Sequence, residues 1–166
     1  GGGVIKGDTG SEDFTLNQLG NSEYFGTLTD VTDFHKTGSG ALTVTGVNAY
    51  SGTAYVDEGE VIVGASAAMN ANNVYEVASG ASLVANSTDG ESNGNTITVL
   101  SGGELSVLSV TTLQTLVNAG STSSKADVGA KSLINDGSWN VLQDHKATTG
   151  ALTGSGTFLL QTVDAT

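Results

Sequence analysis

The sequence predicts an all-β fold, a parallel β-solenoid whose coils have about 20 residues each. Three observations predict it: apolar and polar residues alternate along much of the chain, one short phrase recurs, and the 166 residues include 24 glycines and no proline. Alternation puts every second side chain on the same face of a strand. Proline cannot donate to a strand ladder that is bonded on both sides, so its absence suits stacked coils.

The recurring phrase consists of an apolar residue, a few small or polar residues, a glycine and then an alternating strand. After Gly20, its turn glycines are Gly40, Gly59, Gly80, Gly102, Gly120, Gly137 and Gly156, at spacings of 17 to 22 residues. Such a period is typical of one solenoid coil with two or three short strands. An all-β sandwich is the alternative, but its strands recur every 8–12 residues without long-range self-similarity.

Apolar residues two positions apart follow most of these turns, and we expect them to face the interior. The predicted inward residues are Leu42, Val44, Val61, Val63, Leu83, Leu105, Val107, Trp139 and Val141. Phe158 and Leu160 form a similar pair. After Gly120 the same places hold Thr122 and Ser124, which indicates either a distorted rung or a different register. Residues 65–76 have some helical character, and we expect a wider turn there.

Charge and composition exclude several classes of function. The net charge is −12, with five lysines and no arginine, so nucleic acid and anionic membranes would be repelled. Without cysteine there is neither a disulfide framework nor thiol chemistry, which also suits a chain exported unfolded through an oxidising compartment. No apolar run is long enough for a transmembrane helix, and GGGVIKGDTG does not read as a signal peptide.

A segment of the chain, residues 36–64, resembles a known bacterial repeat. The matching residues are Lys36, Gly38, Gly40, Leu42, Val44, Gly46, Asn48, Tyr50, Gly52, Val56, Gly59 and Val61. They resemble the passenger-associated transport repeat of bacterial autotransporters, K-x-G-x-G-x-L-x-L-x-G-x-N-x-Y-x-G followed by V-x-x-G-x-L. The later rungs and the ending GSGTFLLQTVDAT look like the last coils of an autotransporter passenger.

The resemblance implies a right-handed β-helix on the outer surface of a Gram-negative cell, exported through the periplasm. Residues 1–166 would be a single β-helix segment excised from a longer passenger, acting as a stem. Residues 120–166 would be a C-terminal folding nucleus, or autochaperone, or a cap. The implied partners are the passenger's own coils and a downstream outer-membrane barrel, with no insertion of this segment into the membrane.

Two other functions stay open at this point. An adhesin or self-association module on the same β-helix would bind a host or neighbouring-cell surface protein through polar ladders such as SNGNTITV. A β-helix polysaccharide lyase or hydrolase is less favoured, because the chain has no arginine base and its acidic residues are dispersed. Trp139, Leu152, Phe158, Leu159 and Leu160 concentrate near the C-terminal end, where they either form a nucleus or simply fill the last coils.

We predict no catalytic, cofactor-binding or metal-binding residues. His35 and His145 lack zinc-site spacing, and a dyad of Asp33 with His35 would still need a nucleophile in a cleft. The stretch Asp89–Asn95 resembles the start of an EF-hand loop, but Leu100 stands where the twelfth-position glutamate is required. We expect a protruding polar loop there. No nucleotide-binding motif accompanies the lysine–glycine stretches.

Overall fold

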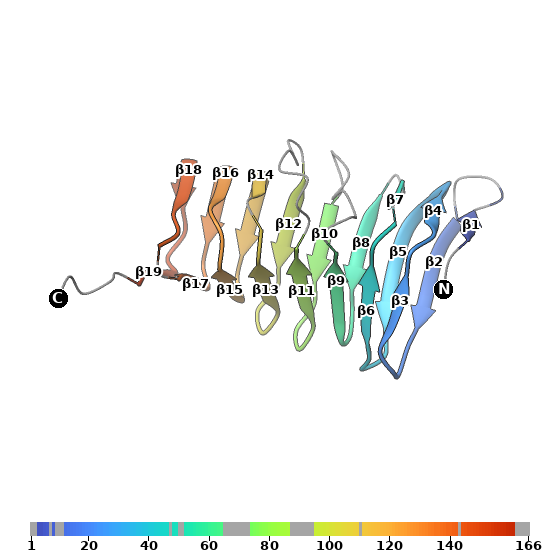
Figure 1. Cartoon of the computed structure of the whole chain (residues 1–166). Coiled ribbons are helices and arrows are strands. Elements are labelled where there is room, and N and C mark those ends of the chain that lie inside the picture. Colours follow the sequence, from blue (N-terminus) through green and yellow to red (C-terminus); the bar gives the residue numbers. More distant parts are fainter. Residues whose placement is uncertain are drawn as a thin grey trace.

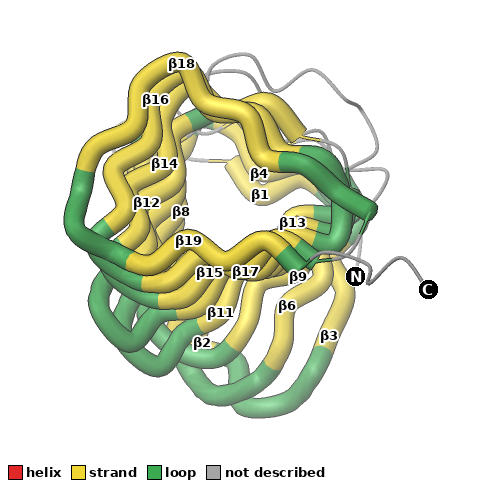
Figure 2. Tube along the Cα trace, turned by 90° about the vertical axis from the view of Figure 1, so that its left-hand side faces the viewer, coloured by secondary structure: helices red, strands yellow, loops and turns green. Residues whose placement is uncertain are grey.

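The computed structural model describes residues 3–6, 8, 12–46, 48–49, 52–64, 74–86, 95–109, 111–142 and 144–161. The described residues form strands and turns without a helix, wound into the predicted right-handed parallel β-helix (Figures 1 and 2). Every strand pair is parallel, as stacking of successive coils requires. With no helix in this part of the chain, the structure contains no helical segment capable of crossing a membrane.

Each coil contributes one strand to each of two long sheets. The first sheet contains β2 (Glu12–Asn17), β5 (Val31–Thr37), β8 (Thr53–Val56), β10 (Val74–Val77), β12 (Thr96–Val99), β14 (Thr111–Asn118), β16 (Val128–Asn135) and β18 (Ala147–Thr153). The second sheet contains β3 (Ser22–Tyr24), β6 (Ala41–Val44), β9 (Glu60–Val63), β11 (Ser82–Ala85), β13 (Glu104–Val107), β15 (Ser121–Ser124), β17 (Ser138–Val141) and β19 (Thr157–Leu160). A third, shorter sheet joins β1 (Val4–Lys6), β4 (Thr27–Thr29) and β7 (Asn48–Ala49) near the N-terminal end.

The register of the second sheet gives the length of each coil. Partners in successive strands lie 20, 19, 22, 22, 17, 17 and 19 residues apart along the chain. From β6 onward, the residue just before each strand of the second sheet belongs to a vertical column of Gly40, Gly59, Ala81, Gly103, Gly120, Gly137 and Gly156. Gly80 and Gly102 therefore precede the column by one residue. Their backbones have φ angles of 80° and 83°, which favour glycine, in turns one residue longer than predicted from the phrase.

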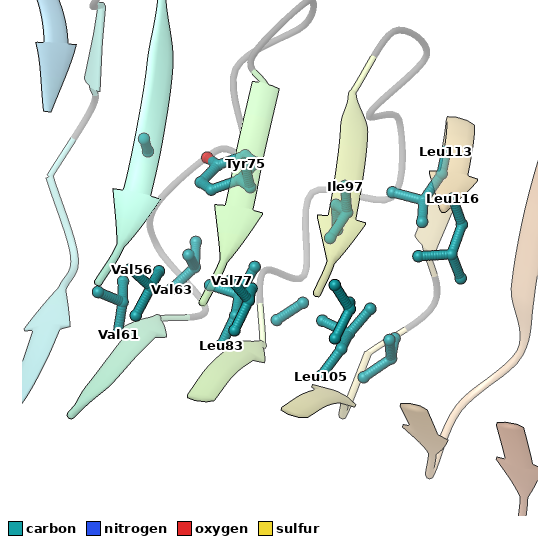
Figure 3. Packing of buried hydrophobic residues seen from close by; sticks show 14 of the residues in the cluster. Val56, Val61, Val63, Tyr75, Val77, Leu83, Ile97, Leu105, Leu113 and Leu116 are labelled. Atoms are coloured by element: carbon teal, nitrogen blue, oxygen red, sulfur yellow. The ribbon is translucent and has the colours of Figure 1, made fainter. Parts of the chain in front are cut away.

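The interior is a narrow apolar stack between the two long sheets (Figure 3). All nine predicted inward residues are buried, with exposed fractions of at most 6%. Leu42, Val61, Leu83 and Leu105 follow one another in register, one per coil. Each buried aliphatic side chain contributes about 1.5–3 kcal/mol. Because these contacts join neighbouring coils, the stack is stabilised by its coil-to-coil interfaces.

Two local expectations are corrected by the structure. Thr122 and Ser124 are in register with Leu105 and Val107 and are buried, so the rung after Gly120 is regular and merely polar. The wider turn predicted for residues 65–76 is wrong for its last three residues, because strand β10 begins at Val74. Residues 65–73 lie outside the described part of the chain.

The pair Phe158 and Leu160 is in the predicted inward register but is not buried. Phe158 pairs with Trp139 and Leu160 with Val141, which continues two interior columns. Their exposed fractions are nevertheless 39% and 55%, because β19 is the outermost strand of the second sheet. The last described coil thus presents interior-type side chains to solvent.

Candidate functional site

The coils from β14 to β19 have the most extensive contacts between neighbouring coils. In the first sheet, β14 and β16 have eight residues each and β18 has seven, whereas β8, β10 and β12 have four. Seven residue pairs join β14 to β16 and six join β16 to β18, against four between β10 and β12. Longer ladders give each of these coils more backbone hydrogen bonds to its neighbour.

A tryptophan crosses the interior of these coils. Trp139 is 1% exposed, and its indole Nε1–H donates to Ser124 Oγ on the preceding coil at 2.8 Å. The small Ser124 side chain leaves room for the indole ring and satisfies its polar atom, as buried tryptophan requires. On the following coil, Phe158 meets the Trp139 ring edge-to-face with centroids 5.3 Å apart. One side chain therefore joins three successive coils.

Two buried asparagines bond neighbouring coils at the turn between the long sheets. Asn118 Nδ2 donates to Asn135 Oδ1 at 2.7 Å and to the carbonyl of Ser138 at 2.9 Å. Asn135 Nδ2 in turn donates to the carbonyl of Thr157 at 3.0 Å. Each amide connects the end of one first-sheet strand to the start of a second-sheet strand one coil later. The sequence signal is an asparagine two residues before the turn glycine, in VNAG and INDG, and our reading of the sequence did not assign it a role.

A buried lysine stabilises the turn inside the repeat segment 36–64. Lys36 has no exposed surface, and its Nζ donates to the carbonyls of Thr37, Gly38 and Glu58 at 3.0, 2.7 and 3.1 Å. The Glu58 carboxylate accepts the Gly38 N–H at 2.9 Å. Burial lowers the pKa of the Lys36 ammonium, and the nearby Glu58 carboxylate opposes this shift. The Lys36 side chain points inward because Lys36 lies two residues after the buried Phe34 on the same strand. Its charge alone would favour an outward, solvent-exposed position.

The candidate dyad residues of the sequence do not form a dyad. Asp33 Oδ1 accepts the backbone N–H of Thr53 at 2.6 Å. His35 instead approaches Asp57, with 2.8 Å between Nδ1 and Oδ2, and stacks on the Tyr55 ring with centroids 4.5 Å apart. These contacts join neighbouring coils on the outer face of the first sheet. Asp33 and His35 therefore have a structural role in holding successive coils together.

The remaining candidate residues, His145 and the stretch Asp89–Asn95, lie in other parts of the chain than His35 and Asp57. His145 lies 3.7 Å from the Asp127 carboxylate at the C-terminal end, where Lys146 also approaches Asp127. Of the stretch Asp89–Asn95, only Asn95 belongs to the described residues, and its side chain is buried. Within the described ranges, no three His, Asp or Glu side chains gather as metal ligands would. The absence of a metal site from the whole chain stays a prediction.

Comparison with known proteins gives no family for this chain. It matches no family model, no curated protein and no solved structure.

Proposed function

We propose that this chain is a β-helical stem from the passenger of a bacterial autotransporter, and that its C-terminal coils nucleate passenger folding. In this role the segment is displayed on the outer surface of a Gram-negative cell after passage through an outer-membrane barrel. The observation that carries the proposal is the extended ladder of β14, β16 and β18, reinforced by the buried Trp139–Ser124 and Asn118–Asn135 hydrogen bonds.

The physical reason concerns the first coil to fold. A solenoid folds by nucleation and then by addition of coils to an existing edge. A single coil buries little apolar surface, so the pair with the strongest mutual contacts forms first. The C-terminal coils have the longest ladders and the only tryptophan of the chain, while the middle coils pair through four-residue strands. Folding would then proceed toward the N-terminus.

The repeat segment, residues 36–64, supports the proposed stem role in a different way. The first residue of the resemblance, Lys36, is buried and bonds three carbonyls of the turn, and Gly38 bonds Glu58. A lysine used in this way serves the stacking of coils. The segment 36–64 therefore fits a structural repeat of a stem, which is the role that the resemblance implies.

The same proposal assigns no catalytic role to the chain. The imidazole of His35 is held between a neighbouring carboxylate and an aromatic ring on the outer sheet face, each contributed by the next coil. The contact between His35 and Asp57 is therefore explained by the stacking of neighbouring coils. A nucleophile aligned with the imidazole would be needed for acyl transfer.

Two measurements test the proposal. In native-state hydrogen exchange, we expect the slowest amides in β14, β16 and β17, because opening them requires unfolding of the nucleus. In a fusion to an outer-membrane barrel, Trp139→Ala should reduce the amount of folded passenger on the cell surface. Phe34→Ala is the matched control, since Phe34 is also a buried aromatic residue but lies in an N-terminal coil.

The control separates a nucleus from a plain stem. We expect Phe34→Ala to leave the C-terminal coils folded and displayed. Equal loss of display in both variants would reduce residues 120–166 to ordinary coils. The slowest exchange in residues 40–63 would place the nucleus at the repeat segment instead.

A further inference from the structure

We propose that the interior of the solenoid binds a small uncharged aromatic compound beside Ala54, between the rings of Phe34 and Tyr75. These three residues belong to successive strands of the first sheet, β5, β8 and β10. The coil of Ala54 has a described coil on either side, so the site lies within the stack. Binding in the interior goes beyond the proposed passenger function and does not depend on it.

One inward column of the first sheet is interrupted by an alanine. From β2 to β12, this column consists of Phe14, Phe34, Ala54, Tyr75 and Ile97. Phe34, Ala54 and Tyr75 are all buried. The two neighbours of Ala54 contribute aromatic rings, whereas Ala54 itself contributes a single methyl group. The column therefore has a gap at the level of β8.

The second sheet does not compensate for this gap. The other inward residues of strands β8 and β9 are Val56, Val61 and Val63. In register with Val61, the larger Leu42 precedes it and Leu83 follows it. Protein interiors are otherwise close-packed, so small side chains between two coils with larger ones leave unfilled space.

A cavity occupies this part of the interior. Its volume is about 200 Å³, and its lining includes Phe34, Ala54, Val56, Val61, Val63 and Tyr75. The Tyr75 ring lies on the side of β10 that faces β8 (Figure 3), so it forms one wall. Apolar cavities of about 150 Å³ stay dry and take up benzene. The space is therefore sufficient for one aromatic ring with a small substituent.

The chemistry of the lining selects an uncharged aromatic ligand. Among the described lining residues, Glu23 is the only charged one, and it lies in β3, two coils before Ala54. A charged group beside Ala54 would lose its hydration without a nearby counter-ion from the lining. An aromatic ring, in contrast, can pair with the rings on either side, since such pairs are favourable at centroid distances of about 4.5–7 Å.

The column already contains one pair of this kind. Phe14 stacks on Phe34 from the preceding coil, with ring centroids 6.1 Å apart and an interplanar angle of 15°. Strands β5 and β10 lie two strand spacings apart, about 9–10 Å, so a ring at the level of β8 is within reach of both neighbours. The bound ring thus takes the place in the column that the Ala54 methyl group leaves empty.

Toluene, a single ring with one methyl group, is the probe for the full 166-residue chain. In carbon–proton NMR spectra, we expect saturable shifts of the methyl signals of Val56, Val61 and Val63. Val128 is the internal reference, because it is buried in β16 and does not line the cavity. A titration without saturable shifts at the three valines overturns the proposal. Equal shifts at Val128 would also overturn it, because they indicate unspecific uptake.

Filling the gap from within tests the location of the site. Ala54→Phe should abolish toluene binding and raise the melting temperature, because the new ring occupies the cavity. Ala130→Phe is the matched control: Ala130 is buried on the inward side of β16 but does not line the cavity. The control should lower the melting temperature by overpacking and leave the toluene shifts at the valines unchanged.

Circular dichroism checks the fold of each variant. If Ala54→Phe does not fold, Ala54→Leu replaces it, because the same column contains Leu116 and Leu133 in later coils. If Ala130→Phe does not fold, Ala151→Phe, at an exposed position of β18, replaces it for the binding measurement. A folded Ala54 variant that binds toluene like the wild type overturns the proposal.

Discussion

The indole nitrogen of Trp139 donates a hydrogen bond to Ser124 Oγ on the preceding coil, with 2.8 Å between the two atoms. Both side chains are fully buried. Ser124 has a neighbour on the same strand, Thr122, which is also buried but whose Oγ1 has no hydrogen-bond partner within the described structure. The two hydroxyl groups of one strand therefore have opposite effects on the stability of the interior.

Removal of the Ser124 hydroxyl should destabilise the protein. Ser124→Ala leaves the Trp139 N–H buried without an acceptor, which costs about 1–3 kcal/mol. The matched variant Thr122→Val keeps the shape of the side chain and removes a hydroxyl without a partner, so we expect an unchanged or higher free energy of unfolding. Chemical denaturation followed by the fluorescence of Trp139, the one tryptophan of the chain, measures both. Equal losses in the two variants would contradict the assigned roles.

The two aromatic residues of the C-terminal coils should differ in their contribution to stability. Trp139→Ala removes a side chain that is 1% exposed and should lower the free energy of unfolding by about 3–5 kcal/mol. Phe158→Ala should cost clearly less, because Phe158 is 39% exposed in the last described coil. Urea denaturation followed by circular dichroism reports both losses. A loss at Phe158 as large as that at Trp139 would contradict the difference in burial between the two side chains.

Much of the fold is predictable from the sequence, because each interior column consists of one short sequence pattern that recurs in every coil. Alternation within one strand and the glycine before it place Leu42 or Leu105 inward without any knowledge of the neighbouring coil. The period then stacks these residues. This is why the nine predicted inward residues are confirmed.

The features that the sequence does not reveal depend on contacts between coils. The register of its strand makes Ser124 an interior residue, but its role as acceptor for the Trp139 indole depends on the coil that follows. Lys36 is buried because carbonyl groups of its own turn and of Glu58 on the next coil converge on its ammonium group. The exposure of Leu160 follows from its place on the outermost strand, which composition does not indicate.

Close approach at the glycine column gives a further prediction. A Cβ added to Gly137 would lie 2.1 Å from the Gly120 carbonyl oxygen, whereas one added to Gly20 would meet no atom within 4 Å. Gly137→Ala should therefore force neighbouring coils apart and cost about 1–3 kcal/mol, in the range of other overpacked sites. Gly20→Ala is the control and should have little effect. Thermal melting of the two variants side by side gives the comparison, and equal melting temperatures would contradict the close approach.

The last prediction concerns the buried lysine of the repeat segment. Lys36→Met keeps a long side chain but removes the donors to the carbonyls of Thr37, Gly38 and Glu58. We expect a loss of about 1–3 kcal/mol in the free energy of unfolding, because buried acceptors lose their partner. Lys131→Met is the matched control, since Lys131 is exposed and its replacement should have a small effect.

The loss caused by Lys36→Met should also depend on pH. Burial lowers the pKa of Lys36 in the folded state, so the unfolded chain binds the proton more tightly. At pH values below the lowered pKa, both states are protonated and the folded state has the full cost of the buried charge. As the pH rises from that value toward the ordinary lysine pKa of about 10.4, this cost is relieved, and the contribution of Lys36 to stability increases.

The difference in free energy of unfolding between wild type and Lys36→Met should therefore grow over this range, measured by urea denaturation at a series of pH values. Ionisation of groups common to both proteins cancels in the difference, so a difference that shrinks with rising pH would show that the folded state favours the protonated lysine.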